Sequence, residues 1–298
     1  MFIDGQKKRA AELCGRRLWT WRNAVGAKSL TTQMPKLTII HTSDLHGRLS
    51  RRIAAVLREL KARRGAVLLD SGDCTAMPNI IASPWAPPVV KRMAEAGYDA
   101  VAVGNREWFF RAAGMRWLAR ALPCPLVATN IEPAERAGLA PMALLDTAGG
   151  KVAVLALARK MVEPRSWLQR LCNHRWIEPS KALAKYLPQA RERADWVIVL
   201  SHLGLRDDLA IATSQPIDLV LGGHDHILTP RGIVSVGSQA DDDGGAGAPV
   251  VHSGYYGRWA TVVTLRRLEE GTAQVAVEVI RLAPDLAGAS VSDEPRPA

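Results

Sequence analysis

Apolar runs and segments of helical periodicity alternate along most of the chain. The pattern predicts an amphipathic helix over 51–63, where Ile53 and Leu57 are spaced to share one face. A second helix is expected over 89–97, which ends at a glycine. Strand-like apolar runs cover 36–43, 65–73, 98–104, 124–131, 151–158, 195–202 and 218–226. Strands that alternate with helices indicate an α/β sheet protein.

The last part of the chain is richer in strand-like sequence. Segments typical of strands follow one another at 249–257, 260–268 and 273–282. These late strands suggest a second sheet that packs on the first. We therefore expect one α/β domain over 36–283, built on two packed mixed β-sheets.

The composition fits a globular protein. Of the 298 residues, 48% are hydrophobic, which allows a sizeable core, and no apolar run is long enough to cross a bilayer. The cysteines show neither zinc-finger nor redox spacing, at Cys14, Cys74, Cys124 and Cys172. We therefore expect a reducing compartment and a cytoplasmic location.

Positive charge is concentrated at the N-terminus. The formal net charge is +10, but residues 1–36 contain eight Lys or Arg and two Asp or Glu, a net +6. The other 262 residues therefore carry only +4. A domain so mildly basic argues against a nucleic-acid partner.

Residues 1–35 form a basic leader that lacks the apolar segment of a secretory signal peptide. Apolar residues recur there at spacings of three and four, which would suit a helix on a membrane surface, at Ala11, Cys14, Leu18, Trp21 and Val25. A membrane partner would be reached only through residues 1–33. The alternative that we favour is a disordered arm, or a translation start that belongs at Met34. Residues 284–298 are expected to form a disordered tail.

Polar side chains gather where several predicted strands end. The sequences "TSDLHG", "DSGD", "GNRE", "SHLG" and "GGHDH" all follow apolar runs. In open α/β sheets, ligands bind in the loops beyond the carboxyl ends of the strands. These loops supply seven candidate metal ligands, namely Asp44, His46, Asp73, Asn105, His202, His224 and His226.

The spacing of these residues supports one shared site. Asp44 and His46, like His224 and His226, are two positions apart, so in an extended segment each pair points to one side. Seven ligands are too many for one tetrahedral ion but suit two ions that share a carboxylate. Oxygen and nitrogen ligands without cysteine favour Mn, Fe, Zn or Co over Ca.

Other polar residues are expected to have structural or surface roles rather than to bind metal. Asp70 is expected to be a structural hydrogen-bonding group rather than a ligand, because an unpaired buried carboxylate is costly. Asp225 should face away from its histidine neighbours. His41, His174 and His252 are interpreted mainly as polar surface residues, although His252 could lie near the site.

The order of these motifs resembles that of the calcineurin-like metallophosphoesterase superfamily, and most closely that of the catalytic domain of bacterial 5′-nucleotidases. The motifs in this order are "SDLHG", "SGD", "GNRE", "SHLG" and "GGHDH". The likeness runs from about residue 37 to about residue 270. It implies a four-layer α/β sandwich of two packed mixed sheets flanked by helices. It also implies that Asp73 bridges two metals, the first bound by Asp44, His46 and His226, and the second by Asn105, His202 and His224.

The resemblance implies dinuclear metal-dependent hydrolysis of a small phosphate ester by a hydroxide that bridges two divalent ions. Manganese is the favoured metal, and phosphomonoesters are the favoured substrates. Arg48, in "GRLSRR", could add a phosphate contact or could simply belong to a solvated helix start. His252 could lie near enough to touch the substrate. Alternative functions are those of a phosphodiesterase or nuclease of the same superfamily, or of a non-catalytic metal-containing binding module.

Two positions depart from the family pattern. The family has His directly after the Asn, and nucleotidases have Asp three residues beyond that His, where this chain has Arg106 and Phe109. Arginine can stabilise transition-state charge but cannot donate a proton. Because general acid–base help is worth ~10²–10⁴-fold in rate, we expect a substrate with a good leaving group or a slow enzyme. Arg106 could instead turn outward and pair with Glu107 or another acid.

A third departure concerns substrate choice. Nucleotidases hold the base and sugar with a C-terminal domain that this chain does not match. Nucleoside specificity therefore does not follow from the resemblance.

Overall fold

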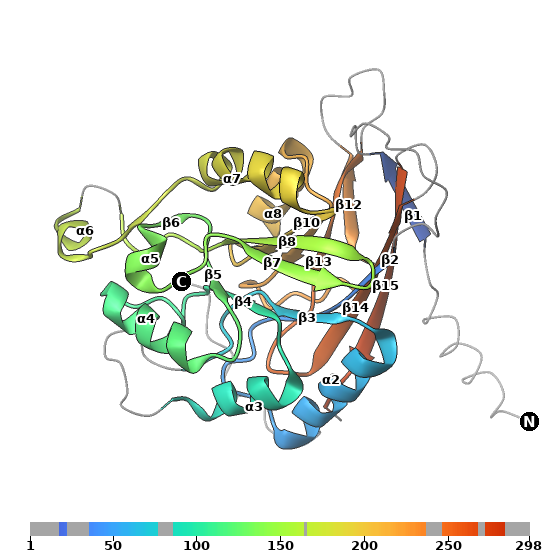
Figure 1. Ribbon diagram of the computed structural model, residues 1–298, viewed down its shortest axis with the longest axis horizontal. Helices are drawn as coiled ribbons and strands as arrows, with labels where there is room; N and C mark the ends of the chain where they lie inside the picture. The colour runs from blue at the N-terminus through green and yellow to red at the C-terminus, as the bar shows by residue number, and fades with distance from the viewer. Residues whose placement is uncertain are drawn as a thin grey trace, which may run out of the picture.

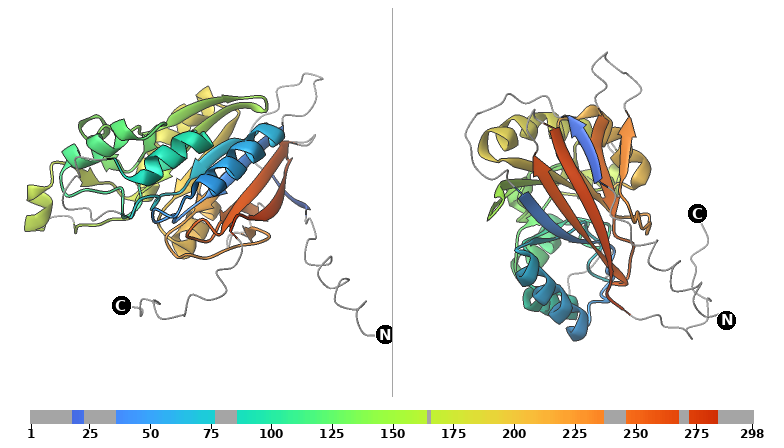
Figure 2. Two further views of the ribbon diagram at one scale, coloured as in Figure 1. Left: turned by 90° about the horizontal axis from the view of Figure 1, so that it is seen from below. Right: turned by 90° about the vertical axis from the view of Figure 1, so that its right-hand side faces the viewer.

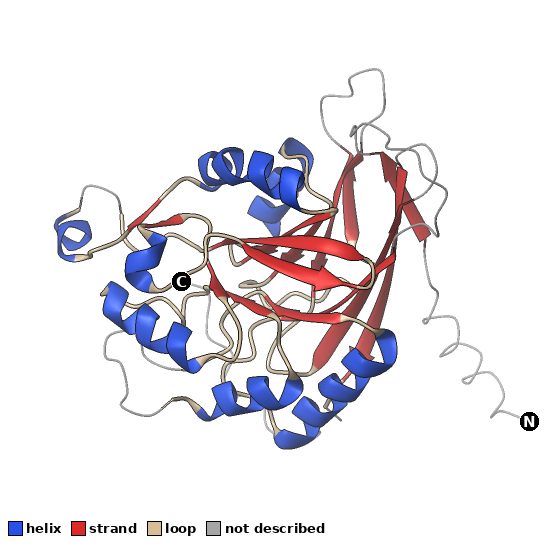
Figure 3. Cartoon of the chain, in the orientation of Figure 1, coloured by secondary structure: helices blue, strands red, loops and turns tan. Residues whose placement is uncertain are grey.

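The computed structural model describes residues 18–22, 36–76, 86–163, 166–236, 246–267 and 272–283. Within these residues, two β-sheets lie face to face between outer layers of helices (Figures 1 and 3). This arrangement confirms the predicted α/β fold of two packed mixed sheets flanked by helices. The rest of the leader and the predicted tail lie outside the described residues.

The first sheet has seven strands, and its central part is parallel. Its order is β1 (Leu18–Arg22), β15 (Thr272–Arg281), β14 (Trp259–Arg267), β2 (Lys36–Thr42), β3 (Val67–Asp70), β4 (Ala100–Ala102) and β5 (Leu126–Val127). The outer face of this sheet packs against α2 (Arg51–Arg64), α3 (Pro88–Ala96), α4 (Ala112–Ala121) and α5 (Ala134–Ala137).

The second sheet has six strands with a parallel centre. Its order is β12 (Ile233–Val236), β13 (Ala246–His252), β11 (Leu219–Gly222), β10 (Trp196–Ser201), β8 (Gly150–Leu157) and β7 (Ala143–Thr147). Its outer face is covered by α7 (Pro179–Arg193) and α8 (Leu205–Ser214). The short elements α6 (Trp167–Leu171), β6 (Ile131–Glu132) and β9 (Arg175–Trp176) complete the described fold.

The apolar runs are continuous because both faces of the central strands are buried. In β2, Ile39 packs between the two sheets, whereas its neighbour Ile40 packs towards the helices. In β10, Ile198 faces the other sheet and Val199 faces α7 and α8. Successive side chains of a strand point to opposite faces, so a strand in the middle of four layers needs apolar residues at both.

Helix α2 illustrates how local sequence positions an element. The Ser50 hydroxyl accepts a hydrogen bond from the Ile53 amide at 3.2 Å, which caps the first turn. Gly65 ends the helix in the left-handed conformation, at φ 56°. No helix in the described part of the chain is both long and apolar enough to span a membrane.

Part of the leader differs from the membrane-surface helix considered above. Residues 18–22 form the extended strand β1, which pairs antiparallel with β15 so that Leu18 lies opposite Ala276 (Figure 2). The helical interpretation is therefore wrong at Leu18 and Trp21, because the exposed edge of β15 offers backbone partners for an extended segment. The rest of that hypothesis lies outside the described residues.

Candidate metal centre

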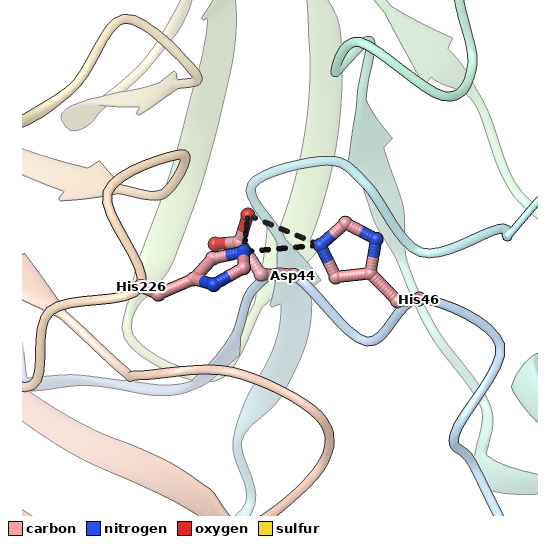
Figure 4. A group of neighbouring side chains, drawn as sticks. All are labelled: Asp44, His46 and His226. Carbon is pink, nitrogen blue, oxygen red and sulfur yellow. Dashed lines mark hydrogen bonds and ion pairs between the residues drawn. The ribbon is translucent and has the colours of Figure 1, made fainter. Parts of the chain in front are cut away.

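The seven candidate ligands come together at the carboxyl ends of strands from both sheets. Loops after β2, β3 and β4 supply four of them, Asp44, His46, Asp73 and Asn105. Loops after β10 and β11 supply the other three, His202, His224 and His226. Two overlapping trios have all their ligand atoms within 4.8 Å of one another, Asp44–His46–His226 (Figure 4) and Asp44–Asp73–His202.

Asp73 lies between imidazoles of the two predicted metal positions. Its Oδ2 is 3.8 Å from His46 Nε2, and its Oδ1 is 3.5 Å from His202 Nε2. A carboxylate that presents one oxygen to each side is suited to bridging two cations. Asp44 is shared by both trios, so it too lies near both positions.

Imidazoles from different sheets meet closely at this site. His46 Nε2 and His226 Nε2 are 3.1 Å apart, and His226 Nε2 is 3.6 Å from Asp44 Oδ1. On the other side, Asn105 Nδ2 lies 3.3 Å from His224 Nδ1. The loops thus present nitrogen and oxygen atoms at distances that a shared metal ion would span.

Most of the candidate ligands have a left-handed backbone conformation, with positive φ. Six non-glycine residues of the described chain have positive φ, and five are candidate ligands, with φ 51° at Asp44, 45° at His46, 55° at Asp73, 80° at His224 and 58° at His226. The sixth is Tyr256. Such conformations cost about 1–3 kcal/mol each and persist where the surrounding structure enforces them, often at functional sites. The pairs therefore converge through left-handed residues and not, as expected, through extended segments.

Glu107 fixes the two loops that carry Asp73 and Asn105. This buried carboxylate accepts hydrogen bonds from the amides of Asp73 at 2.7 Å and Gly104 at 3.0 Å through Oε2, and from Thr75 at 3.0 Å through Oε1. Glu107 is therefore not available to Arg106 in the alternative considered above, because its carboxylate points inward to backbone donors. Sequence reasoning placed Glu107 in the motif but missed this role.

His202 is the most deeply placed of the imidazoles. Its Nδ1 donates to the Ser71 carbonyl at 2.8 Å, which directs Nε2 towards Asp73. Nε2 is buried and has no hydrogen-bond partner among the described residues. A buried imidazole nitrogen that faces a carboxylate across 3.5 Å fits a cation held between them.

The pKa values of the site residues also indicate a site suited to positive charge. Burial lowers the pKa of His202, but Asp73 and Asp44 outweigh burial and raise it to about 9. Burial lowers the pKa of His46 to about 4 and raises the pKa of Asp44 to about 6. Without metal, a proton on His202 supplies the positive charge that the buried carboxylates require. The donor set therefore fits divalent cations.

Arg106 and Phe109 occupy different environments. Arg106 is exposed, and its backbone amide donates to Asp73 Oδ1 at 2.7 Å, while its side chain forms no ion pair with the described residues. Phe109 is buried, packs edge-on against Trp117 and lies against the backbone of Gly114. The position of the expected aspartate is thus filled by a core residue.

Arg48 and His252, the two residues predicted to contact the substrate, lie in different environments. Arg48 is exposed, and its guanidinium lies 4.0 Å from the ring centroid of Tyr256, which packs edge-on against His46. A phosphate contact for Arg48 stays a prediction. His252 is fully buried, with Nε2 2.8 Å from Asp208 Oδ2. The prediction of a substrate contact for His252 is wrong, because its imidazole packs behind Gly222 in the sheet.

The remaining polar residues are mostly structural. Asp70 accepts hydrogen bonds from Thr42 and Gly72, as expected, and Asp225 turns away to accept from the Leu205 amide. His41, His174 and His252 are buried and hydrogen-bonded, so their interpretation as surface residues is wrong.

Arg159 is a neighbour of the site that sequence reasoning missed. It follows β8, and its Nη1 lies 2.7 Å from His224 Nε2. The signal was present, because "ALARK" places a cation directly after a strand of the second sheet.

Comparisons with known proteins agree with this geometry. Residues 37–228 match the family described as calcineurin-like phosphoesterase. The chain is 26% identical over 236 residues to the trifunctional nucleotide phosphoesterase protein YfkN of Bacillus subtilis, covering 65% of this chain and 16% of that protein. It is also 26% identical over 264 residues to the snake venom 5′-nucleotidase of Gloydius brevicauda, covering 75% and 44%.

A solved structure shares the fold. The crystal structure of a 5′-nucleotidase precursor from Thermus thermophilus matches with a TM-score of 0.66 and 21% identity, covering 84% of this chain and 56% of that one. The chain spans less than half the length of the two curated relatives named above.

Proposed function

The chain belongs to the calcineurin-like phosphoesterase family, and on that basis we propose that it hydrolyses small phosphate monoesters with two divalent metal ions. The observation that carries this proposal is the placement of Asp73 between the imidazoles of His46 and His202, each within 3.8 Å. Two histidines on opposite sides of one carboxylate suit two cations rather than one. The nucleotide phosphoesterase and nucleotidase relatives support a phosphate-ester substrate.

The ions would be held as the motifs suggest. Asp44, His46 and His226 would hold one, His202, His224 and Asn105 the other, and Asp73 would contact both. When bound, such ions supply an activated water and neutralise charge on phosphoryl oxygens. The chain contributes rigid placement, because Glu107 fixes Asp73 through the backbone and Ser71 fixes the tautomer of His202.

Arg106 would bind the transferred phosphoryl group. Its exposed side chain stands beside Asn105, and its amide is tied to Asp73 at 2.7 Å. A guanidinium binds phosphate oxygens in a fixed fork and keeps its charge at any ordinary pH. It cannot protonate a leaving oxygen. We therefore propose that esters with good leaving groups are the better substrates.

The test is hydrolysis of 4-nitrophenyl phosphate and its bis ester by the full chain, with and without Mn²⁺. We expect metal-dependent turnover of the monoester, and a loss of at least ~100-fold in Asp73→Asn because a bridging ligand is removed. Asp146→Asn is the matched control, since Asp146 is exposed on the edge strand β7. Circular dichroism would establish that both variants are folded.

Two other results of this test would change the proposal. Preference for the bis ester would replace the monoesterase proposal with that of a phosphodiesterase. Absence of turnover of both esters, in folded and metal-loaded protein, would overturn the enzymatic proposal in favour of a metal-containing binding module.

A further inference from the structure

A cavity adjoins the candidate metal centre on the side of the second sheet. Its volume is about 430 Å³, and its lining includes Arg159, Lys160, Trp176, Ile177, Glu178 and Asp207. Leu203, directly after the candidate ligand His202, also lines it. A larger cavity of about 590 Å³ lies elsewhere, around α5 and α7, and none of the candidate ligands lines it. No candidate ligand lines the smaller cavity either, but Leu203 and Arg159 connect it to His202 and His224, so it is placed to serve the site.

Arg159 connects this cavity to the metal centre. Its side chain lines the cavity, and its Nη1 lies 2.7 Å from His224 Nε2 and 3.4 Å from the Leu203 carbonyl. It is exposed and forms no ion pair with the described residues. A guanidinium has five N–H donors, so Arg159 keeps donors that a phosphate oxygen can use.

The walls of the cavity differ in character. Trp176 and Ile177 supply an apolar wall, and the buried indole N–H of Trp176 has no hydrogen-bond partner among the described residues. Lys160 is paired with Glu163 at 2.9 Å. Glu178 and Asp207 are exposed carboxylates without an ion pair in the described part of the chain. Beyond Arg159 and the Lys160–Glu163 pair, the charged residues of the lining are thus acidic, and they stand beside an apolar wall.

We propose that this cavity binds the alcohol portion of the substrate, with Arg159 holding a phosphate oxygen at its entrance. The acidic wall selects phosphate esters of uncharged or cationic alcohols, because a second anionic group would face Glu178 and Asp207. An aromatic or aliphatic body fits against Trp176 and Ile177. This inference rests on the proposed phosphoesterase function, and it adds a binding site and a substrate class to it.

The first experiment measures hydrolysis by Arg159→Met. We expect KM for 4-nitrophenyl phosphate to rise about 10- to 100-fold with kcat changed far less, because a charge-assisted hydrogen bond to the bound phosphate is lost. Arg159→Lys should recover part of the loss. Arg193→Met is the control, since Arg193 is exposed and precedes the amino end of β10, whereas the site lies at the carboxyl end of that strand.

The second experiment tests alcohol selection with phenyl phosphates that differ only in the para substituent. Aminomethyl and methyl derivatives should have a lower KM than the carboxylate derivative. The double substitution Glu178→Gln/Asp207→Asn should reduce this discrimination. Equal KM values for the three esters in the wild-type protein would overturn the substrate class.

The third experiment needs neither metal nor turnover. The indole N–H resonance of Trp176, assigned with Trp176→Phe, is followed in metal-free protein during titration with 4-(aminomethyl)phenol or 4-hydroxybenzoate. We expect a saturable shift with the amine at lower concentration than with the carboxylate. Turnover by the wild-type protein without any Trp176 shift, and with unchanged KM in Arg159→Met, would overturn the inference alone. A saturable Trp176 shift without turnover would instead contradict the proposed function and leave a binding site.

Discussion

At the scale of single residues, the sequence predicts which side chains form the candidate site but does not predict their geometry. Residue types and order pointed to the seven candidate ligands. The left-handed backbone of Asp44, His46, Asp73, His224 and His226 could not be predicted, because it is unfavourable locally and is imposed by contacts with distant loops. For example, the Asp44 amide donates to the Gly72 carbonyl at 3.0 Å, a residue from another strand end.

The replacement of the family's histidine by Arg106 leads to a prediction about leaving groups. In Arg106→His, hydrolysis of alkyl phosphates should increase relative to that of 4-nitrophenyl phosphate, because an imidazole can protonate a poor leaving group. The gain should stay below the full ~10²–10⁴-fold of general acid catalysis, since no carboxylate orients the new imidazole. The measurement is kcat/KM across esters of graded leaving-group pKa.

Arg106→Met is the companion variant, and it should slow all the esters alike through loss of charge. An unchanged leaving-group dependence in Arg106→His would show that the position does not contact the leaving oxygen. The missing carboxylate cannot be restored simply, because Phe109 is buried and its removal alone would cost about 3–5 kcal/mol.

At the scale of elements, strands were easier to predict than helices. The central strands are apolar on both faces and stood out as continuous runs. Helices α4, α7 and α8 are not predicted from the sequence, and two of them contain a residue that disfavours a helix interior. α7 contains Pro188 and α4 contains Gly114. In α8, by contrast, Asp207 and Asp208 in the first turn are a helix-start signal. Their positions follow from packing on the sheets rather than from local sequence.

The hydrogen bonds of Glu107 between the loops after β3 and β4 give a prediction about metal affinity. Glu107→Gln keeps the shape of the side chain but places an NH₂ group where backbone donors now point. We expect the affinity for Mn²⁺ to fall about 10- to 100-fold, as for other residues that orient metal ligands. Titration calorimetry of the metal-free protein would measure it.

Glu192→Gln, an exposed change on α7, is the control for that titration. Equal affinities in wild-type, Glu107→Gln and Glu192→Gln proteins would show that the loop after β3 holds Asp73 without Glu107.

At the scale of the whole molecule, a buried polar network connects the sheets. His41 of β2 lies between the hydroxyls of Ser71 at 2.7 Å and Ser253 at 2.6 Å. Ser71 also donates to the Leu221 carbonyl of the second sheet at 2.6 Å, and Ser253 donates to Thr261 of β14 at 3.0 Å. The network therefore joins both sheets beneath the candidate ligands.

This network predicts a pH dependence of stability. Burial, reinforced by His252, lowers the pKa of His41 from 6.5 to about 3. The unfolded chain therefore binds a proton more readily, so this contribution to stability is complete above pH 6.5 and is lost as pH falls towards 3. By pH 5 the loss should be about 2 kcal/mol.

Urea unfolding of the metal-free wild-type protein and of His41→Gln at pH 7 and pH 5 would isolate the share of His41, because other buried imidazoles such as His174, with its pKa lowered to about 4, also destabilise the fold at pH 5. His41→Gln should be less stable at pH 7, because two hydrogen bonds are altered, but its stability should fall less between the two pH values. Parallel losses in the two proteins would show that His41 remains accessible to protons in the folded state.

The close contact between His46 and His226 would affect the rate at which the metal-bound chain unfolds. These residues are 180 positions apart in the sequence and come from different sheets. An ion held by both would act as a reversible cross-link that closes a very long loop, and long closed loops restrict the unfolded chain most. Separation of the sheets would then require release of the ion. The same atoms that serve chemistry would also slow unfolding, so that metal supply would govern how long each molecule resists proteolysis.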